Sequence, residues 1–265
     1  MTFYTKKLTA PSYKYYTTLR IITMFVKHTF KCKKDDQSTY CIASFPKSGN
    51  TWVRFFIANL YNQIEPIYPE IDFYNIHDIV PEIGKEETFI FQNFPNVYKT
   101  HDQYNKSFSP VILILRNPYD VILSYYYYLN GEQKNNITLS EVIHHKQYGI
   151  DSIVTHTNSY INNCKELLII TYEQLHSVPF KYFSKIASFL NINFKQQDIT
   201  TAIEKSSFEQ MKAIELNKGR KYGSMDFTFM HKGKIGEGYS QINYKDLAYI
   251  SQRIKKAPIT NLLYG

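Results

Sequence analysis

The sequence SFPKSGNTW, residues 44–52, places hydroxyl and amide side chains around one lysine in a short turn. An apolar segment precedes the turn and an amphipathic one follows it, so the turn is expected to open a helix. Backbone N–H groups at a helix start, with the positive end of the helix dipole, bind anions. Lys47 adds a cation there, and Ser48, Asn50 and Thr51 add donors. The segment predicts an anion pocket, and a structural turn with solvated polar residues is the alternative.

The order of residues in this turn differs from that of a nucleoside-triphosphate P-loop. In the pattern G-x-x-x-x-G-K-[ST] the lysine follows the last glycine. Here Lys47 precedes Gly49, the only glycine of the segment. Trp52 offers a flat face on which a purine could stack. The turn therefore suits a nucleotide but departs from the ATP-binding pattern.

A second anion site is indicated by Arg116, which ends the apolar run VILILR and precedes Asn117-Pro118. An arginine at a strand end can hold a phosphate through two parallel hydrogen bonds. Ser124 follows eight residues later, on the expected helix, and could reach the same anion. A lone arginine would more often pair with a carboxylate. Beside the first turn, a phosphate site becomes the favoured interpretation.

A third basic element, FMHKGKIGEGYSQI, occupies residues 229–242. Lys232 and Lys234 alternate there with three glycines, which gives a flexible loop that attracts anions. Such a loop can fold over phosphates, and it can equally be a plain surface turn.

His101 ends another apolar segment, NVYKTH. An imidazole beside an anion pocket can accept a proton from a hydroxyl group near neutral pH. The other histidines of the sequence lack such a setting. His101 is therefore the candidate general base.

The candidate residues can form one site only if the strands that carry them end at the same edge of a sheet. Four apolar segments predict buried strands: residues 40–45, 96–101, 111–116 and 167–172. Three of them lead into expected helices, TWVRFFIANLY, YDVILSYYYYL and VPFKYFSKIASFL. The alternation predicts a three-layer α/β/α domain with a central parallel sheet. Ligands of such sheets bind at the carboxyl ends of the strands, where the candidate residues fall.

The composition predicts one main domain preceded by a basic arm. The 265 residues are 43% hydrophobic, enough for one substantial core. Residues 1–34 hold eight of the 31 Lys and Arg residues and no acidic residue, so the other 23 basic residues balance the 23 acidic ones. We therefore expect an amphipathic arm over residues 1–36, a domain over 37–265, and no nucleic-acid partner. Three scattered cysteines and the lack of metal-ligand spacings predict neither a disulfide framework nor a metal.

Two interpretations of the arm stay open. It is either an ordinary amphipathic helix packed on the domain or a helix that settles on an anionic membrane surface. Its apolar run is too short to span a bilayer, and no cleavable signal pattern is visible. The expected location is the cytoplasm, with the membrane surface as the alternative.

Taken together, these segments resemble the sulfotransferases that use 3′-phosphoadenylyl sulfate (PAPS), especially the cytosolic type, from about residue 40 to the C-terminus. SFPKSGNTW resembles the loop for the 5′-phosphosulfate, LRNPYDVILSYY the 3′-phosphate segment, and FMHKGKIGEG the C-terminal R-K-G-x-x-G loop. YKTH, TYEQL and SSFEQMK match three further segments in the same order. The resemblance implies a P-loop NTPase-like fold, PAPS as sulfate donor, 3′-phosphoadenosine 5′-phosphate (PAP) as product, and no metal.

The resemblance also implies roles for individual residues. His101 would be the base, Lys47 would stabilise the leaving oxygen, and Lys99 would assist. The residues implied to bind the donor are Lys47, Ser48, Gly49, Asn50, Thr51, Trp52, Arg116, Ser124, Tyr172, Ser206, Phe208, Phe229, Met230, His231, Lys232 and Gly233. The early lysine then makes sense, because the bond to be broken lies next to a single 5′-phosphate.

The sequence departs from the family pattern at two positions of the C-terminal loop. His231 replaces the usual arginine, and Gly238 replaces the usual tryptophan. The dimer motif of the animal cytosolic enzymes, K-x-x-x-T-V-x-x-x-E, is not visible either.

Other functions and the acceptor also stay open. The alternatives are a P-loop kinase, disfavoured by the early lysine and the lack of an acidic residue ending a strand, and a non-catalytic nucleotide-binding protein. The acceptor would be a small molecule, glycan or lipid with a hydroxyl group. Its pocket is expected among the loops near residues 62–95, 130–160 and 215–228.

Overall fold

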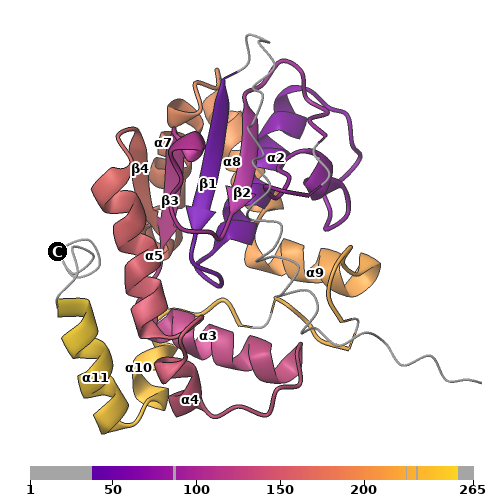
Figure 1. The fold of residues 1–265 in the computed structure, drawn as a ribbon. Helices are drawn as coiled ribbons and strands as arrows, with labels where there is room; N and C mark the ends of the chain where they lie inside the picture. The colour runs from indigo at the N-terminus through magenta and orange to yellow at the C-terminus, as the bar shows by residue number, and fades with distance from the viewer. Residues whose placement is uncertain (1–37, 86–87, 225, 231, 256–265) are drawn as a thin grey trace, which may run out of the picture. The chain divides into compact units, whose positions relative to one another are not determined.

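The computed structural model describes residues 38–85, 88–224, 226–230 and 232–255. The basic arm, and with it the hypothesis of membrane contact, lies outside the described residues. Within them, the sheet is parallel and has the strand order β2-β1-β3-β4 (Figure 1). Its strands are β1 (Thr39–Ser44), β2 (Asn96–Thr100), β3 (Val111–Leu115) and β4 (Leu167–Thr171).

All four predicted strands are confirmed, and each ends one residue earlier than the sequence suggested. The residues just beyond the strand ends are Phe45, His101, Arg116 and Tyr172. β1 lies between β2 and β3 in the sheet, so the strands that follow it in sequence are placed on opposite sides of it. The carboxyl ends of these strands therefore meet at a topological switch point. The fold therefore brings the candidate residues to one edge of the sheet.

The predicted helices after β1 and β3 are confirmed, as is the helix over the VPFKYFSKIASFL segment, which spans Pro179–Phe189. Between β4 and this last helix lies a short additional helix, α6, which begins at Tyr172 because the Thr171 and Gln174 side chains form a capping box. The helices are α2 (Asn50–Ile64), α3 (Pro118–Gly131), α4 (Leu139–His144), α5 (Ile150–Asn163), α6 (Tyr172–Ser177), α7 (Pro179–Phe189), α8 (Gln196–Lys205), α9 (Phe208–Lys218), α10 (Glu237–Gln241) and α11 (Tyr244–Lys255), with 3₁₀ turns at Asn75–Asp78 and Lys106–Phe108.

Alternate residues of the strands enter two separate apolar cores. Ile42 and Ile112 pack with α2, α7 and α8 on one face of the sheet, whereas Ala43 and Leu113 pack with α3 and α5 on the other. The side-chain alternation of a strand explains this division. Both faces are covered, which gives the predicted three-layer α/β/α architecture (Figure 1).

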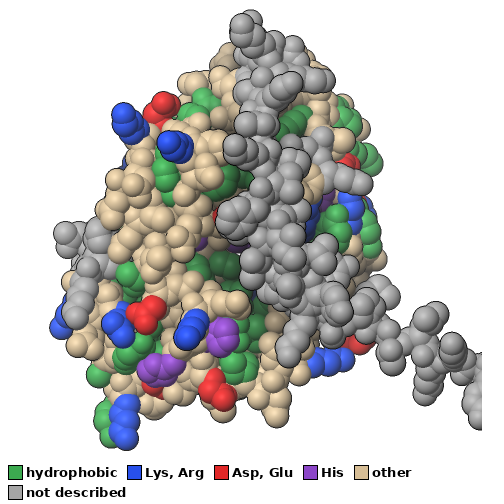
Figure 2. Space-filling model, in the orientation of Figure 1, with side chains coloured by type: hydrophobic (Ala, Val, Ile, Leu, Met, Phe, Trp, Pro, Cys, Tyr) green, Lys and Arg blue, Asp and Glu red, His purple; other side chains and the backbone are tan. Residues whose placement is uncertain are grey.

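Charged side chains of both signs are visible among the described residues in Figure 2. Lys and Arg side chains stand there in separate places, with Asp and Glu side chains among them. In the part of the chain that the structure describes, no helix is long and apolar enough to cross a membrane.

Candidate functional site

The turn after β1 is shaped by two residues with left-handed backbone conformations. Lys47 has φ 72°, and Gly49, the N-cap of α2, has φ 101°. A Cβ atom on Gly49 would lie 2.7 Å from the ring of Tyr172. Only glycine fits here, because the position combines positive φ with close contact to an aromatic ring. The turn is thereby packed against the start of α6.

The Lys47 ammonium group lies between aromatic rings. Its Nζ atom is 3.7 Å from the centre of the Phe229 ring and 4.7 Å from that of Tyr128. Burial, followed by the charges of Arg116 and Arg220, lowers the pKa of Lys47 to about 7. Lys47 therefore changes charge near neutral pH in the free protein.

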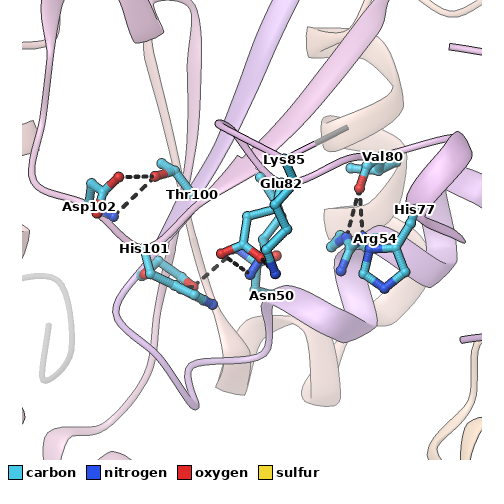
Figure 3. A network of polar contacts seen from close by, with 11 residues as sticks. Asn50, Arg54, His77, Val80, Glu82, Lys85, Thr100, His101 and Asp102 are labelled. Carbon is cyan, nitrogen blue, oxygen red and sulfur yellow. Dashed lines mark hydrogen bonds and ion pairs between the residues drawn. The ribbon is translucent and has the colours of Figure 1, made fainter. Parts of the chain in front are cut away.

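His101 is oriented by the end of β1. Its Nδ1 atom is 2.8 Å from the carbonyl oxygen of Ser44 and 3.4 Å from the Ser44 hydroxyl, which accepts a hydrogen bond from Asn50 (Figure 3). Because a carbonyl oxygen can only accept, Nδ1 carries the proton and Nε2 keeps its lone pair. Burial, followed by the Lys99 ammonium, lowers the pKa of His101 to about 3. The neutral imidazole is thus the stable form at physiological pH.

Lys99 lies two residues before His101 and pairs with a carboxylate that the sequence analysis did not identify. The Glu82 carboxylate lies 3.3 Å from Lys99 Nζ and 2.6 Å from Lys85 Nζ. Burial lowers the pKa of Lys99 to about 8, although Glu82 opposes this shift. Glu82 reaches Lys99 because residues 81–83 run beside β2, with backbone hydrogen bonds on both sides of Lys99. No local motif marked this contact.

Arg116 connects two of the predicted anion loops. Its Nη1 atom donates to the Lys47 carbonyl at 3.1 Å and its Nη2 atom to the Lys234 carbonyl at 2.8 Å. The guanidinium group also lies over the Tyr172 ring, 4.4 Å from its centre. Its Nε atom is buried and has no partner within the described residues, and no described carboxylate pairs with Arg116. The alternative of a salt-bridge arginine is therefore not realised among these residues.

The aromatic residues of the predicted nucleotide site lie together. Trp52 contacts the Tyr172 ring edge-to-face at 5.5 Å, and its Nε1 atom is buried without a hydrogen-bond partner in the described part of the chain. The Tyr172 hydroxyl donates to the Gly233 carbonyl at 3.0 Å. Gly233 has φ 64°, and a Cβ atom there would lie 2.6 Å from Phe208. The C-terminal loop thus runs directly over the aromatic side chains.

Buried carboxylates hold the C-terminal loop in place. Asp120, in the first turn of α3, accepts hydrogen bonds from the backbone of Gly236 and Gly238, both at 2.8 Å. A Cβ atom on Gly238 would lie 2.2 Å from the backbone of Tyr119. No side chain fits at position 238 in this arrangement, which agrees with a glycine in place of the tryptophan of the family pattern.

A second carboxylate positions the residues beside Lys47. Glu215 of α9 accepts hydrogen bonds from the backbone of Phe229 and Met230, at 2.6 and 2.8 Å. Arg220 pairs with Glu215 at 3.0 Å and with Glu132 at 2.9 Å. These contacts fix the segment that places Phe229 against Lys47. No local motif predicts these contacts, which join residues 5 to 88 positions apart along the chain.

The remaining predicted residues differ in their surroundings. Ser48 is buried in the turn, whereas Ser124 is partly buried on α3 and has no side-chain partner among the described residues. The Ser206 hydroxyl, at the C-cap of α8, donates to the Ile203 carbonyl of that helix. Lys232 pairs with Glu237 at 3.4 Å. His231 lies outside the described residues, and the described residues contain no group of three metal-ligating side chains.

Residues 37–259 match the sulfotransferase domain, and the chain therefore belongs to the sulfotransferase family. It is similar to cytosolic sulfotransferase 17 of Arabidopsis thaliana, with 26% identity over 83% of this chain and 73% of the relative. It is also similar to a 3-alpha-hydroxysteroid sulfotransferase of Cavia porcellus, with 25% identity over 80% of this chain and 79% of that protein.

Solved structures confirm the fold predicted from the family resemblance. Mouse sulfotransferase SULT7A1 complexed with PAP superposes with a TM-score of 0.60 and 20% identity, over 83% of each chain. Retinol dehydratase in complex with androsterone and inactive cofactor PAP also gives a TM-score of 0.60, with 17% identity over 82% of this chain and 80% of the other.

Proposed function

We propose that the protein transfers the sulfuryl group of PAPS to the hydroxyl group of an acceptor. Membership of the sulfotransferase family supports the reaction class. The observation that carries the mechanism is the hydrogen bond from His101 Nδ1 to the Ser44 carbonyl, which leaves Nε2 as a proton acceptor. A neutral imidazole with one oriented lone pair is the group that a hydroxyl nucleophile requires.

The donor would lie across the three basic loops. Arg116 would bind the 3′-phosphate, with Ser124 and the Lys232-Gly233 backbone close to it. The turn at Ser48–Thr51 would hold the 5′-phosphate through its N–H groups and side chains. Trp52, Tyr172 and Phe208 would flank the adenine. Two buried donors without partners among the described residues, Trp52 Nε1 and Arg116 Nε, fit a polar, anionic purine nucleotide in this place.

The transfer would be an in-line displacement at sulfur. His101 Nε2 takes the hydroxyl proton while the acceptor oxygen forms a bond to sulfur. The bond between sulfur and the bridging phosphate oxygen breaks, and its electron pair stays on the PAP phosphate. Lys47 stabilises that oxygen, and Lys99 stabilises charge near the acceptor. The proton taken from the acceptor hydroxyl stays on the His101 imidazole until solvent removes it.

Labelled PAPS, incubated with the protein and a panel of phenols, alcohols and sugars, tests the reaction. Appearance of labelled sulfate on an acceptor, lost in His101→Ala, is the expected result. Consumption of ATP without sulfation would favour the kinase alternative. Tight PAP binding without turnover, unaffected by His101→Ala, would favour a non-catalytic nucleotide-binding protein.

A further inference from the structure

A group of basic side chains lies beside the catalytic candidates and has no part in the donor site. Two of its members, Arg54 and His77, lie on the far side of Glu82 from His101 (Figure 3). The members of this basic cluster are Arg54, His77, Lys85 and Lys221.

The Tyr222 ring joins three members of the cluster. The Lys85 ammonium lies 4.6 Å from the centre of this ring and the Lys221 ammonium 5.7 Å. The His77 ring meets it edge-to-face at 5.0 Å. Tyr222 is half exposed, at 50%, so this surface is open to solvent.

Arg54 adds a buried positive charge to the basic cluster, and the Glu82 carboxylate raises its pKa against the larger effect of burial. The Arg54 side chain is buried, with 6% exposure, and both Nε and Nη2 donate to the single carbonyl of Val80. Within the described residues no carboxylate forms an ion pair with Arg54 or Lys221, and Glu82 is already shared by Lys85 and Lys99. Buried charges in proteins are normally paired. A bound anion would supply negative charge beside this buried guanidinium group.

His77 adds a directed hydrogen-bond donor. Its Nδ1 atom lies 3.5 Å from Arg54 Nη2, which can only donate, so Nδ1 accepts and Nε2 carries the proton. Burial, followed by Arg54, Lys221, Lys85 and Lys99, lowers the pKa of His77 to about 3. The imidazole stays neutral, and its N–H group and the cations around it all favour a negatively charged ligand.

We propose that the basic cluster is an anion-binding subsite that selects acceptors carrying an acidic group, such as a carboxylate, away from the hydroxyl that is sulfated. This inference rests on the proposed function for the identity of the ligand as an acceptor. Glu82 connects the two places, because it contacts Lys85 of the cluster and Lys99 beside His101. In this proposal the acceptor spans the two places, with its hydroxyl at His101 and its acidic group at the cluster.

Matched acids and amides test the subsite by binding alone. The full chain, saturated with PAP, is titrated by calorimetry with 4-hydroxyphenylacetate and 3-(4-hydroxyphenyl)propionate and with their neutral amides. The acid of at least one pair is expected to bind about fivefold to tenfold more tightly than its amide, as several exposed charge pairs together allow. Raising the salt concentration should reduce the preference.

Variants of the exposed Lys221 show where the preference arises. Lys221→Gln should reduce it by about threefold and Lys221→Glu further, because the second change reverses the charge. Lys181→Gln is the matched control: Lys181 likewise precedes a tyrosine and lies 5.4 Å from the Tyr182 ring, but it belongs to α7. This control should leave the preference unchanged.

The outcomes separate the subsite from the transferase activity. An acid preference that falls in the order Lys221→Gln, Lys221→Glu supports the subsite even if no acceptor is sulfated. Equal binding of acid and amide, no binding of either acid, or a preference that both Lys221 variants retain overturns it. Sulfation of the amides in that case would leave the proposed function intact.

Discussion

The Nδ1 atom of His101 lies 2.8 Å from the carbonyl oxygen of Ser44, the last residue of the interior strand β1. The backbone of one strand thus determines which nitrogen of a neighbouring strand's histidine carries the proton. A strand backbone is among the least variable parts of a fold, so Nε2 keeps the same direction.

Replacing the base tests this relationship. His101→Gln keeps a side-chain N–H that can donate to Ser44 but has no group able to take a proton at neutral pH. We expect kcat for sulfuryl transfer to fall by about 10²–10⁴-fold, the usual contribution of general base catalysis. PAP affinity, measured by calorimetry, should stay unchanged. Turnover close to that of the unaltered protein would show that another group removes the proton.

The pH profile of kcat/KM for PAPS should carry the signature of Lys47. Its pKa of about 7 means that the ammonium form is lost as the pH rises above 7, and kcat/KM should fall there. Because the pKa of His101 is lowered to about 3, no loss is expected between pH 7 and pH 5, where an ordinary histidine would become protonated. In the profile of kcat the alkaline fall should move to higher pH, since bound phosphates favour the ammonium form.

Two variants assign that alkaline fall. Lys47→Arg keeps its charge at all accessible pH values, so the fall near pH 7 should disappear and leave one near 8 from Lys99. Phe229→Leu removes the ring that lies 3.7 Å from Lys47 Nζ and lets water reach the ammonium group, so the fall should move upward. A fall that stays at pH 7 in Lys47→Arg would exclude Lys47 as its source.

Arg116 should distinguish nucleotides by their 3′-phosphate. We expect the protein to bind PAP more tightly than AMP, and Arg116→Gln to remove about 1.5–3 kcal/mol from PAP binding, the contribution of hydrogen bonds to a charged group. AMP binding should change less, by the amount that reflects the contacts of Arg116 with the Lys47 and Lys234 carbonyls. Equal losses for both nucleotides would place the 3′-phosphate elsewhere.

The strands and the catalytic candidates were predictable because each has a local signal. Buried strands in a parallel sheet are continuous apolar runs, and three of the four runs end in a polar side chain that the sequence alone placed at the strand end. His101, Arg116 and Tyr172 all follow a strand directly. The positions of these residues along the sequence therefore determined their positions at the sheet edge.

The carboxylates that hold the site were not predictable from the sequence. Glu82 pairs with Lys99, Asp120 accepts from Gly236 and Glu215 accepts from Phe229; these partners are 17, 116 and 14 residues away, respectively. An isolated acidic residue in a polar segment has no pattern that separates it from a solvated one. The tyrosine run shows the same limit: Tyr125 stacks on Tyr148, whereas Tyr128 lies against Lys47.

The C-terminal loop should lose its place when Asp120 is changed. Asp120→Asn keeps one acceptor oxygen, so one of the two N–H groups of Gly236 and Gly238 is left facing an amide that cannot accept. An unpaired buried group costs about 1–3 kcal/mol, and we expect Tm to fall by about 2–4 °C for each kcal/mol. PAP should also bind more weakly, because this loop carries Lys232 and Gly233.

A matched change separates the loop contact from a general loss of charge. Asp226 is exposed, and its carboxylate has no partner among the described residues, so Asp226→Asn should leave both Tm and PAP affinity unchanged. Thermal unfolding with and without PAP measures both effects in one experiment, since a bound ligand raises Tm in proportion to its affinity. If Asp120→Asn behaves like Asp226→Asn, the two backbone hydrogen bonds do not hold the loop, and its position must depend on the contact of Gly238 with Tyr119.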